Sequence, residues 1–440
     1  MRSSHSLDRL CVQFDDEHLV SDAGLLLPAT LAQHLGLPEL LNTVNLGDAP
    51  GHANPGVKAM TLIHSFLSGG DCIDDADALR SGATGAVLGH ALRAPSTLGT
   101  FLRSFSWADA RQLDRVSREA LRRAWSTGAG PGSAPLTIDL DSSICETYGL
   151  NKEGGRFGHT GVRGYHPLLA LRASTGEVLH ERLRGGNAHT GRGAGGFLTE
   201  CFARVREAGA TGKITVRADS GFYSHKVVTA CERAGADWSI TTKMSPGLRK
   251  RIQNIKEQAW VSIPYFLDGA DVAETTYPAF ATGKKNAAEY RLIVRRVRPT
   301  PGSQLSLLVE YSYHAFITNR TGDMLEVEVD HRRHAECENA IRDLKYGVGL
   351  NHLPSGRFGA NAAWLALNCM AHNLSRWVGM IGLGEQTFAS TKTLRRRFFS
   401  IPGRITRSAR ERMLHLPQHW PWAAQFLAAL AVLRAVRLVT

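Results

Sequence analysis

The segment LTIDLDSS, residues 136–143, places two carboxylates in a run of otherwise apolar and small side chains. The run predicts a β-strand, and because side chains alternate between the two faces of a strand, Asp139 and Asp141 point to the same side. A carboxylate taken out of water is strongly destabilised unless a positive group meets it. The segment therefore predicts a buried strand whose charged face meets a metal, an arginine or bulk water.

The segments that follow give the order of the sheet. GYHPLLALRAS and VLHERLR predict a hairpin that turns at Thr175 and Gly176. Further on, AGGFLTECFARVREAGA and HKVVTACERAG predict helices, and KITVRAD and DWSITT predict the strands that follow them. Three antiparallel strands followed by helix-connected strands are the plan of the ribonuclease H-like fold, in which helices flank a mixed sheet.

The regions around this core differ from it in composition. Residues 1–128 carry apolar positions at helical spacing and end near the Gly-, Pro- and Ser-rich stretch STGAGPGSAP. Residues 243–330 are rich in β-branched and aromatic side chains, with EYRLIVRRVR and LSLLVEYSYHAFITN as long strands. We therefore expect an α/β protein with a helical N-terminal region, a core in two parts (129–242 and a helical 331–440 with basic C-terminal helices) and a β-rich insertion between them.

Bulk properties narrow the class of partner and compartment. The 52 Lys and Arg against 40 Asp and Glu give a formal charge of +12, which favours a polyanionic partner. The seven cysteines are scattered without a CxxC pair, so neither a zinc ribbon nor a disulfide framework is indicated. No apolar run fits a signal peptide or a membrane span. We expect a soluble, cytoplasmic protein with free thiols and no membrane partner.

Asp219 is a second acidic position, separate from the first pair. It ends the apolar strand in VRADSGFYS, just before a glycine turn. Functional groups favour the carboxyl end of a strand, where the chain turns at the edge of the sheet. We expect Asp219 to lie near Asp139 and Asp141.

The stretch HRRHAECENAIRDLKYG, residues 331–347, supplies a third acidic position on a helix. At about 100° per residue, Glu338 falls on a narrow stripe, whereas Glu336 points roughly the opposite way. The members of this stripe are His331, His334, Glu338 and Lys345. A lysine and two histidines on the face of Glu338 are suited to meeting a phosphate.

Carboxylates from three separate elements suit a two-metal phosphoryl-transfer site. Two divalent ions bridged by oxygens activate the attacking hydroxyl and stabilise the leaving oxygen. Oxygen ligands favour Mg²⁺ over zinc, with Mn²⁺ as its substitute. The spacing therefore predicts a site for two Mg²⁺ ions.

The motifs DLDSS, VRADSGFYS and ENAIRDLKYG resemble, in this order, the three acidic motifs of bacterial insertion-sequence DDE transposases. Within that family, the sequence resembles the cut-and-paste subgroup that carries a Tyr, Arg, Glu and Lys signature on the third-motif helix. The resemblance implies Asp141, Asp219 and Glu338 as catalytic metal ligands, Asp139 as an accessory neighbour and Lys345 as the signature lysine. It implies metal-dependent strand cleavage at the ends of the element and strand transfer into target DNA.

The resemblance also implies a set of DNA contacts. The partners are terminal inverted repeats and target DNA, bound by a homodimer or a larger assembly at the nucleoid, with the N-terminal helices on the repeats. The residues expected at DNA phosphates are His331, His334 and Lys345, with the neighbouring Arg332 and Arg333 in compensation. Separately, the overall charge and the flanking aromatic residues of the LRRRFF run predict that Arg395 and Arg396 contact the DNA backbone. The glycine-rich LRGGNAHTGRGAGG is expected to be a loop near the site, with His189 or Arg192 on DNA. The sequence departs from the signature at His331 and His334, which stand for Tyr and Arg, and histidine is the weaker phosphate clamp at neutral pH.

Two other readings compete with this one. LTIDLDSS also fits the nucleophile motif of haloacid dehalogenase-like phosphatases, in which Asp139 attacks phosphorus and Asp141 is the acid–base. The order of motifs argues against it, because the strand that ends at Thr242 and the candidate Lys243 follow RADSG instead of preceding it. The second alternative is a transposase-derived protein that binds DNA without cutting, which the two histidine substitutions favour and the retention of all three acids disfavours.

Overall fold

The computed structural model of the 440-residue chain describes most of the sequence. The described ranges are 10–49, 51–158, 160–264, 269–280, 288–299, 311–384, 389–408 and 411–438.

A nine-stranded mixed sheet forms the centre of the molecule, and five of its strands have the predicted ribonuclease H-like arrangement. In spatial order they are β7 (Val178–Arg182), β6 (Leu168–Arg172), β2 (Leu136–Ser142), β8 (Ile214–Ala218) and β9 (Asp237–Thr241). β6 is antiparallel to both β2 and β7, whereas β8 runs parallel to β2 and β9 parallel to β8. The connections from β7 to β8 and from β8 to β9 contain α8 (Ala194–Glu207) and α9 (His225–Arg233). The predicted fold class is therefore confirmed.

The β-rich insertion extends this sheet. Its strands add antiparallel to the free edge of β9 in the order β13 (Ser312–Thr318), β12 (Ala288–Val297), β11 (Ala270–Ala279) and β10 (Val261–Ser262). The two predicted long strands correspond to β12 and β13, although the LSLLVE portion lies outside the described residues. Sequence reasoning missed β11, and it also missed α10 (Pro246–Gln253) and α11 (Met324–Arg332) in this region.

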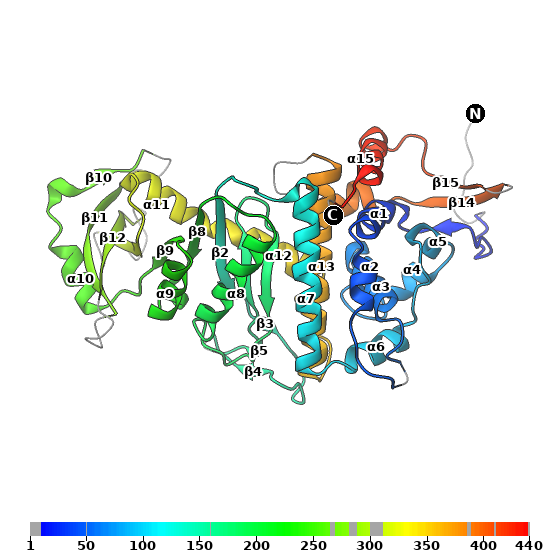
Figure 1. Cartoon of the computed structure of the whole chain (residues 1–440), viewed down its shortest axis with the longest axis horizontal. Helices are drawn as coiled ribbons and strands as arrows, with labels where there is room; N and C mark the ends of the chain where they lie inside the picture. Colours follow the sequence, from blue (N-terminus) through cyan, green and yellow to red (C-terminus); the bar gives the residue numbers. More distant parts are fainter. Residues whose placement is uncertain are drawn as a thin grey trace.

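A helical block covers the opposite end of the sheet (Figure 1). Its two longest helices, α7 (Trp107–Ala124) and α13 (Phe358–Trp377), lie side by side between β7 and the shorter N-terminal helices. These shorter helices are α1 (Leu26–His34), α2 (Leu37–Asn42), α3 (Pro55–Ser68), α4 (Ala76–Arg80), α5 (Thr84–Leu88) and α6 (Pro95–Arg103). One hydrophobic cluster runs from this block through the sheet, so the predicted domain boundaries stay a prediction.

The remaining segments are a small sheet after β2, the helix α12 and the C-terminal region after α13. A small three-stranded sheet follows β2 and consists of β3 (Cys145–Glu146), β5 (Arg163–Tyr165) and β4 (Arg156–Phe157). α12 (Cys337–Gly347) passes behind the large sheet in the view of Figure 1, whereas α8 and α9 lie in front of it. The C-terminal region holds α14 (Thr391–Leu394), α15 (Ala423–Ala435) and a hairpin, β14 (Gly403–Ser408) and β15 (Glu411–His415), which pairs with β1 (Leu19–Val20). Sequence reasoning expected only helices there.

Two further observations bear on the predicted class. All seven cysteines are free thiols. Within the described residues, no helix combines the length and the apolarity needed to cross a membrane.

Candidate active site

Asp141 and Asp219 lie at the carboxyl ends of two neighbouring parallel strands. Leu140 of β2 pairs with Ala218 of β8, so the next residue of each strand is one of the two acids. Burial raises the pKa of Asp141; His334 and the amide of Ser142 oppose this shift, and the charge of Asp219 adds to it. Asp219 accepts a hydrogen bond of 2.9 Å from the amide of Gly221, which fixes its side chain at the turn. The sheet register thus brings the first two predicted acids together.

The helix that carries Glu338 runs alongside β2. The imidazole Nδ1 of His334 lies 2.9 Å from Oδ1 of Asp139, and the thiol of Cys337 lies 3.4 Å from Oδ2 of Asp141. Further along the helix, Nζ of Lys345 donates to the carbonyl oxygen of Ile144 at 2.7 Å. Glu338 is exposed and directly follows Cys337, so these contacts hold it on the turn of α12 next to the end of β2. Sequence reasoning missed Cys337, which gave no motif signal.

Asp139 has an arginine as its positive partner. Its side chain is 1% exposed and accepts two hydrogen bonds of 2.8 Å from Nε and Nη2 of Arg217 on β8. Arg217 is itself buried and also donates to the carbonyl oxygen of Asp330 at 2.7 Å. Asp139 and Asp141 share a face as predicted, but only Asp141 sits at the open end of the strand beside another acid. Asp139 thus has a supporting position between β8 and the helix.

The match to a family model decides the class of protein. The model, described as transposase DDE domain group 1, matches residues 3–438. The chain belongs to this DDE transposase family. The cryo-EM structure of a piggyBac transposase synaptic complex with hairpin DNA is similar, with a TM-score of 0.45, 10% identity, and coverage of 86% of this chain and 79% of that one. No curated protein matches the chain.

The protein is thus a DNA transposase, an enzyme that depends on divalent metal ions. The phosphatase alternative is not favoured, and the geometry agrees, because the carboxylate of Asp139 is engaged by Arg217 and closed off from solvent. Among the described residues, no Lys or Arg forms an ion pair with Asp141, Asp219 or Glu338. Asp141 and Asp219 are neighbouring carboxylates without such a cation, and such a pair fits hard divalent ions, which take oxygen ligands. The side-chain oxygens of Asp141, Asp219 and Glu338 do not all lie within 4.8 Å of one another.

The stripe predicted on the third-motif helix is broken in the transposase. Residues Arg333–Glu336 form a tighter 3₁₀ turn between α11 and α12, so spacing on an ideal helix does not hold across it. His331 consequently points to the sheet, where its ring nitrogens lie 2.8 Å from Oγ of Ser239 and 2.9 Å from Oγ1 of Thr241. Burial, with lesser contributions from neighbouring basic side chains, lowers the pKa of His331 to about 3. A neutral, internally bonded imidazole offers no charge to a phosphate, so these contacts do not support the expected contact of His331 with DNA, which stays a prediction.

The other predicted phosphate contacts divide into engaged and exposed side chains. His334 is held by Asp139, and Arg332 lies 3.5 Å from the carboxylate of Glu328 on its own helix. Arg333 is 63% exposed and lies 3.4 Å from Glu336. The predicted DNA contacts of His334, Arg332 and Arg333 stay predictions.

The first arginine of the LRRRFF run, Arg395, is bonded inside the protein. Arg395 donates to the carbonyl oxygens of Phe66, Leu67 and Gly347, and thereby caps the ends of α3 and α12. A guanidinium bonded to three carbonyls has a structural role, so these contacts do not support the predicted DNA contact of Arg395, which stays a prediction. Phe398 and Phe399 are buried in the core, whereas Arg396 is exposed, and its contact with DNA stays a prediction.

The glycine-rich loop after β7 rests against the turn that carries Asp219. Buried Arg184 organises it, with hydrogen bonds to the carbonyl oxygens of Thr190 at 2.7 Å and Arg192 at 3.2 Å. A Cβ on Gly221 would lie only 2.8 Å from Cβ of Thr190, so the loop and the turn are in close contact. The structure places this loop near the site, as predicted, with the side chains of His189 and Arg192 exposed. Sequence reasoning missed the role of Arg184.

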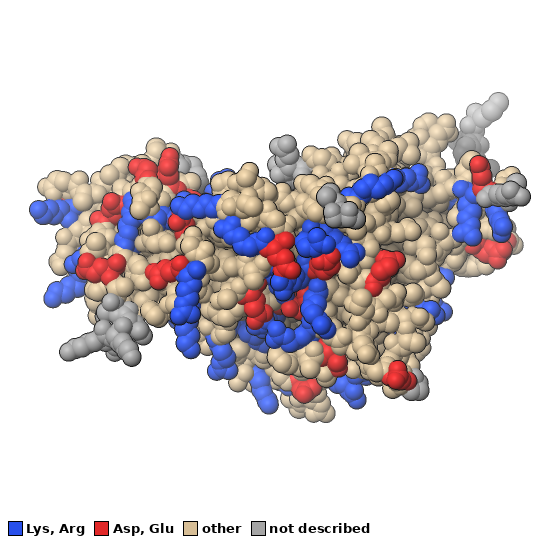
Figure 2. All heavy atoms as spheres, in the orientation of Figure 1, with Lys and Arg blue, Asp and Glu red and all other residues tan. Residues whose placement is uncertain are grey.

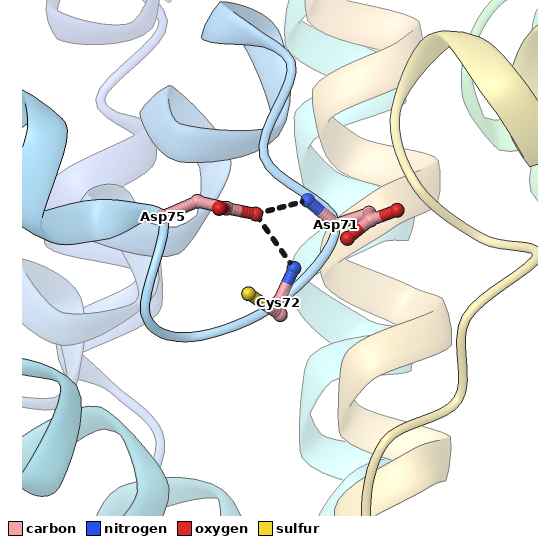
Figure 3. Close-up of side chains that lie close together, drawn as sticks. All are labelled: Asp71, Cys72 and Asp75. Carbon is pink, nitrogen blue, oxygen red and sulfur yellow. Dashed lines mark hydrogen bonds between the residues drawn. The ribbon is translucent and has the colours of Figure 1, made fainter.

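A different group of potential metal ligands lies in the N-terminal region, between α3 and α4 (Figure 3). Ligand atoms of Asp71, Cys72 and Asp75 fall within 4.8 Å of one another. However, Oδ2 of Asp75 accepts hydrogen bonds from the amides of Asp71 and Cys72 at 2.8 and 3.0 Å. Burial raises the pKa of the Cys72 thiol, which keeps it protonated. These features describe a hydrogen-bonded loop turn.

Proposed function

We propose that this transposase binds two Mg²⁺ ions, with Mn²⁺ as a substitute, through Asp141, Asp219 and Glu338. We further propose that it cleaves DNA at the ends of its element and joins the freed 3′-hydroxyl to target DNA. The observation that supports this assignment is the parallel pairing of Leu140 with Ala218, which aligns two acids from distant motifs. When bound, the metal ions supply activation of the attacking oxygen and stabilisation of the leaving one.

The protein's own residues hold the site in place. The Asp139–Arg217 pair joins β2 to β8 directly below the two acids, and His334 joins the same pair to the third-motif helix. Lys345 ties the far end of α12 to the chain that follows β2. Three acids on separate elements thereby keep a fixed relation to one another, which positioned metal ligands require.

The proposed DNA partner is double-stranded DNA that carries the terminal inverted repeats, bound by a homodimer or a larger assembly. The formal charge of +12 supports a polyanionic partner. The face shown in Figure 2 carries many Lys and Arg side chains, but acidic side chains interleave with them over α7 and α8. There Arg118 pairs with Glu207, and Arg204 pairs with Asp114. Paired charges contribute little to phosphate binding, so we expect DNA to follow unpaired basic side chains such as Arg396.

The test is cleavage of a duplex that carries the element's end, with Mg²⁺, by the wild type and by Glu338→Gln. The matched control is Glu336→Gln, an exposed acid two residues earlier that lies 3.4 Å from Arg333. We expect cleavage to be lost in Glu338→Gln and retained in Glu336→Gln. Equal cleavage by the wild type and Glu338→Gln would overturn the assignment. DNA binding without cleavage by the wild type would instead favour the non-cutting alternative.

A further inference from the structure

The first turn of α12 contacts Asp141 through the thiol of Cys337. Sγ of Cys337 lies 3.4 Å from Oδ2 of Asp141 and donates a hydrogen bond to it. Cys337 is buried, with 6% of the residue exposed. An S–H group is a weak donor, but Asp141 stands at the proposed metal site, where small shifts of a ligand decide binding. The contact therefore links α12 directly to a proposed metal ligand.

Asp141 receives one donor on each of its two carboxylate oxygens. Oδ1 accepts from the amide of Ser142 at 2.6 Å, and Oδ2 accepts from the thiol of Cys337. A single donor leaves a carboxylate free to rotate about its Cβ–Cγ bond, whereas donors on both oxygens fix its plane. An ionised carboxylate has about four lone-pair sites, so about two remain for metal ions. Cys337 thus supplies the half of this constraint that does not come from β2 itself.

The spacing of side chains on the third-motif segment matches the spacing of the acids on β2. Asp139 and Asp141 are alternate residues of the strand, about 6.6 Å apart along it. His334 and Cys337 are three residues apart across the 3₁₀ turn of Arg333–Glu336. In 3₁₀ geometry two such residues lie on the same side about 6 Å apart, whereas an ideal α-helix rises only about 4.5 Å. The 3₁₀ turn therefore lets His334 contact Asp139 while Cys337 contacts Asp141.

The same contact places the backbone of Glu338. Glu338 follows Cys337 directly and is exposed in the first turn of α12. Its side-chain oxygens, together with those of Asp141 and Asp219, do not all fall within 4.8 Å of one another. Cys337 is thus the residue through which the third acid is attached to the first.

We propose that Cys337 is a positioning residue for metal binding, which holds the carboxylate of Asp141 in one orientation and keeps the backbone of Glu338 beside it. This inference rests on the proposed function, because it takes Asp141 and Glu338 as metal ligands. Loss of a hydrogen-bond partner of a metal ligand typically lowers metal affinity about 10- to 100-fold. Because a thiol is a weak donor, we expect the lower end of this range, about 10-fold.

The test is Mn²⁺ binding by the full-length protein on DNA, measured from the electron paramagnetic resonance signal of free Mn²⁺. The DNA is a duplex already cut at the element's end, so that no cleavage occurs during the titration. In Cys337→Ala the donor is lost, and we expect the dissociation constant for Mn²⁺ to rise about 10-fold. In Cys337→Ser a hydroxyl donor is kept, and the affinity should stay near that of the wild type. The Mg²⁺ concentration that gives half-maximal cleavage of intact ends should rise in Cys337→Ala by the same factor.

Alanine and serine differ in the hydroxyl group and little in volume, so this pair of variants separates the donor from packing. Cys201→Ala is the matched control, because this buried thiol lies on α8, and its Mn²⁺ affinity should be unchanged. Thermal unfolding in EDTA shows whether each variant is folded at the temperature of the titration.

Equal Mn²⁺ affinity of Cys337→Ala and the wild type would overturn the proposal, as would tighter binding by Cys337→Ala. A loss in Cys337→Ser as large as in Cys337→Ala would also overturn it and would assign Cys337 a packing role. Failure of the proposed function is distinct, since it appears as equal Mn²⁺ binding by the wild type and Glu338→Gln, or as no binding by the wild type. Either of these results would overturn the proposed metal site, and this inference with it.

Discussion

The two carboxylates of β2 should respond oppositely to the same substitution. Asp139 is 1% exposed and is bonded twice to Arg217, which is 3% exposed. In Asp139→Asn, the charge is removed and the new amide N–H₂ faces guanidinium N–H groups, so the buried arginine loses its counter-charge. In Asp141→Asn, no such pair is broken, because burial and the charge of Asp219 already disfavour the ionised form of Asp141.

The size of the first effect follows from the burial of the pair. Removing one partner of a buried ion pair costs about 3–5 kcal/mol. At about 2.1 cal/mol/K per residue, unfolding of 440 residues carries about 0.9 kcal/mol/K, so Asp139→Asn should lower the Tm by about 3–5 °C. Asp141→Asn should leave the Tm unchanged or raise it, because it relieves repulsion from Asp219, and should abolish DNA cleavage.

The assay is thermal unfolding in EDTA, followed by cleavage at a temperature well below every Tm. Glu207→Gln is the control, since it breaks an ion pair with Arg118 in which both side chains are nearly half exposed. An exposed pair contributes about 0–1 kcal/mol, so this variant should shift the Tm by about 1 °C at most. A Tm of Asp139→Asn within 1 °C of the wild type, about the size of that control shift, would refute the reasoning. So would an Asp141→Asn variant that is equally destabilised.

Four other perturbations follow from the contacts. Burial depresses the pKa of His331 from its ordinary value of 6.5 to about 3. As the pH falls below 6.5, the unfolded chain binds a proton at this histidine before the folded chain does. The free energy of unfolding therefore falls between pH 6.5 and 3, by up to about 1.4 kcal/mol per pH unit. Thermal unfolding at pH 7.5 and 5 should show a smaller loss in His331→Gln. Arg395→Met should lower the Tm because it removes the hydrogen bonds to the ends of α3 and α12. Arg396→Ala should leave the Tm unchanged. It should reduce the slope of log affinity against log salt concentration by the amount of about one phosphate contact, as measured by fluorescence anisotropy of labelled DNA. Gly221→Ala should weaken cleavage by pushing the glycine loop away, and Thr190→Gly should restore it, because the new Cβ would otherwise lie 2.8 Å from Cβ of Thr190.

Local patterns predicted the core of the fold and the first two acids. β2 and β8 are short apolar runs that end in acids, and the order of strands and helices fixes which strands run parallel. Once β2 and β8 are parallel neighbours, the adjacency of Asp141 and Asp219 follows from pairing alone. Arg217 was also readable in part, since an arginine in the middle of the apolar strand ITVRA requires a buried counter-charge.

Contacts between distant segments were not readable. The stripe on the third-motif helix assumed one continuous helix, and no glycine or proline marks the 3₁₀ turn at residues 333–336. The partners of His331 on β9 lie about ninety residues away. Arg395 caps α3 across more than three hundred residues. Charge and spacing alone predict that such side chains face solvent. Neither property indicates which distant carbonyl or hydroxyl group the fold brings next to the side chain.

The two departures from the signature acquire a physical meaning from these contacts. His331 and His334 stand where the subgroup has Tyr and Arg, and both rings are used inside the protein, one on β9 and the other on Asp139. An arginine at position 334 would compete with Arg217 for the same carboxylate, whereas the imidazole of His334 approaches it with a single ring nitrogen. We therefore expect positive charge for a DNA phosphate to come from side chains other than these two histidines. The histidines thus strengthen the support of the acids from inside the protein.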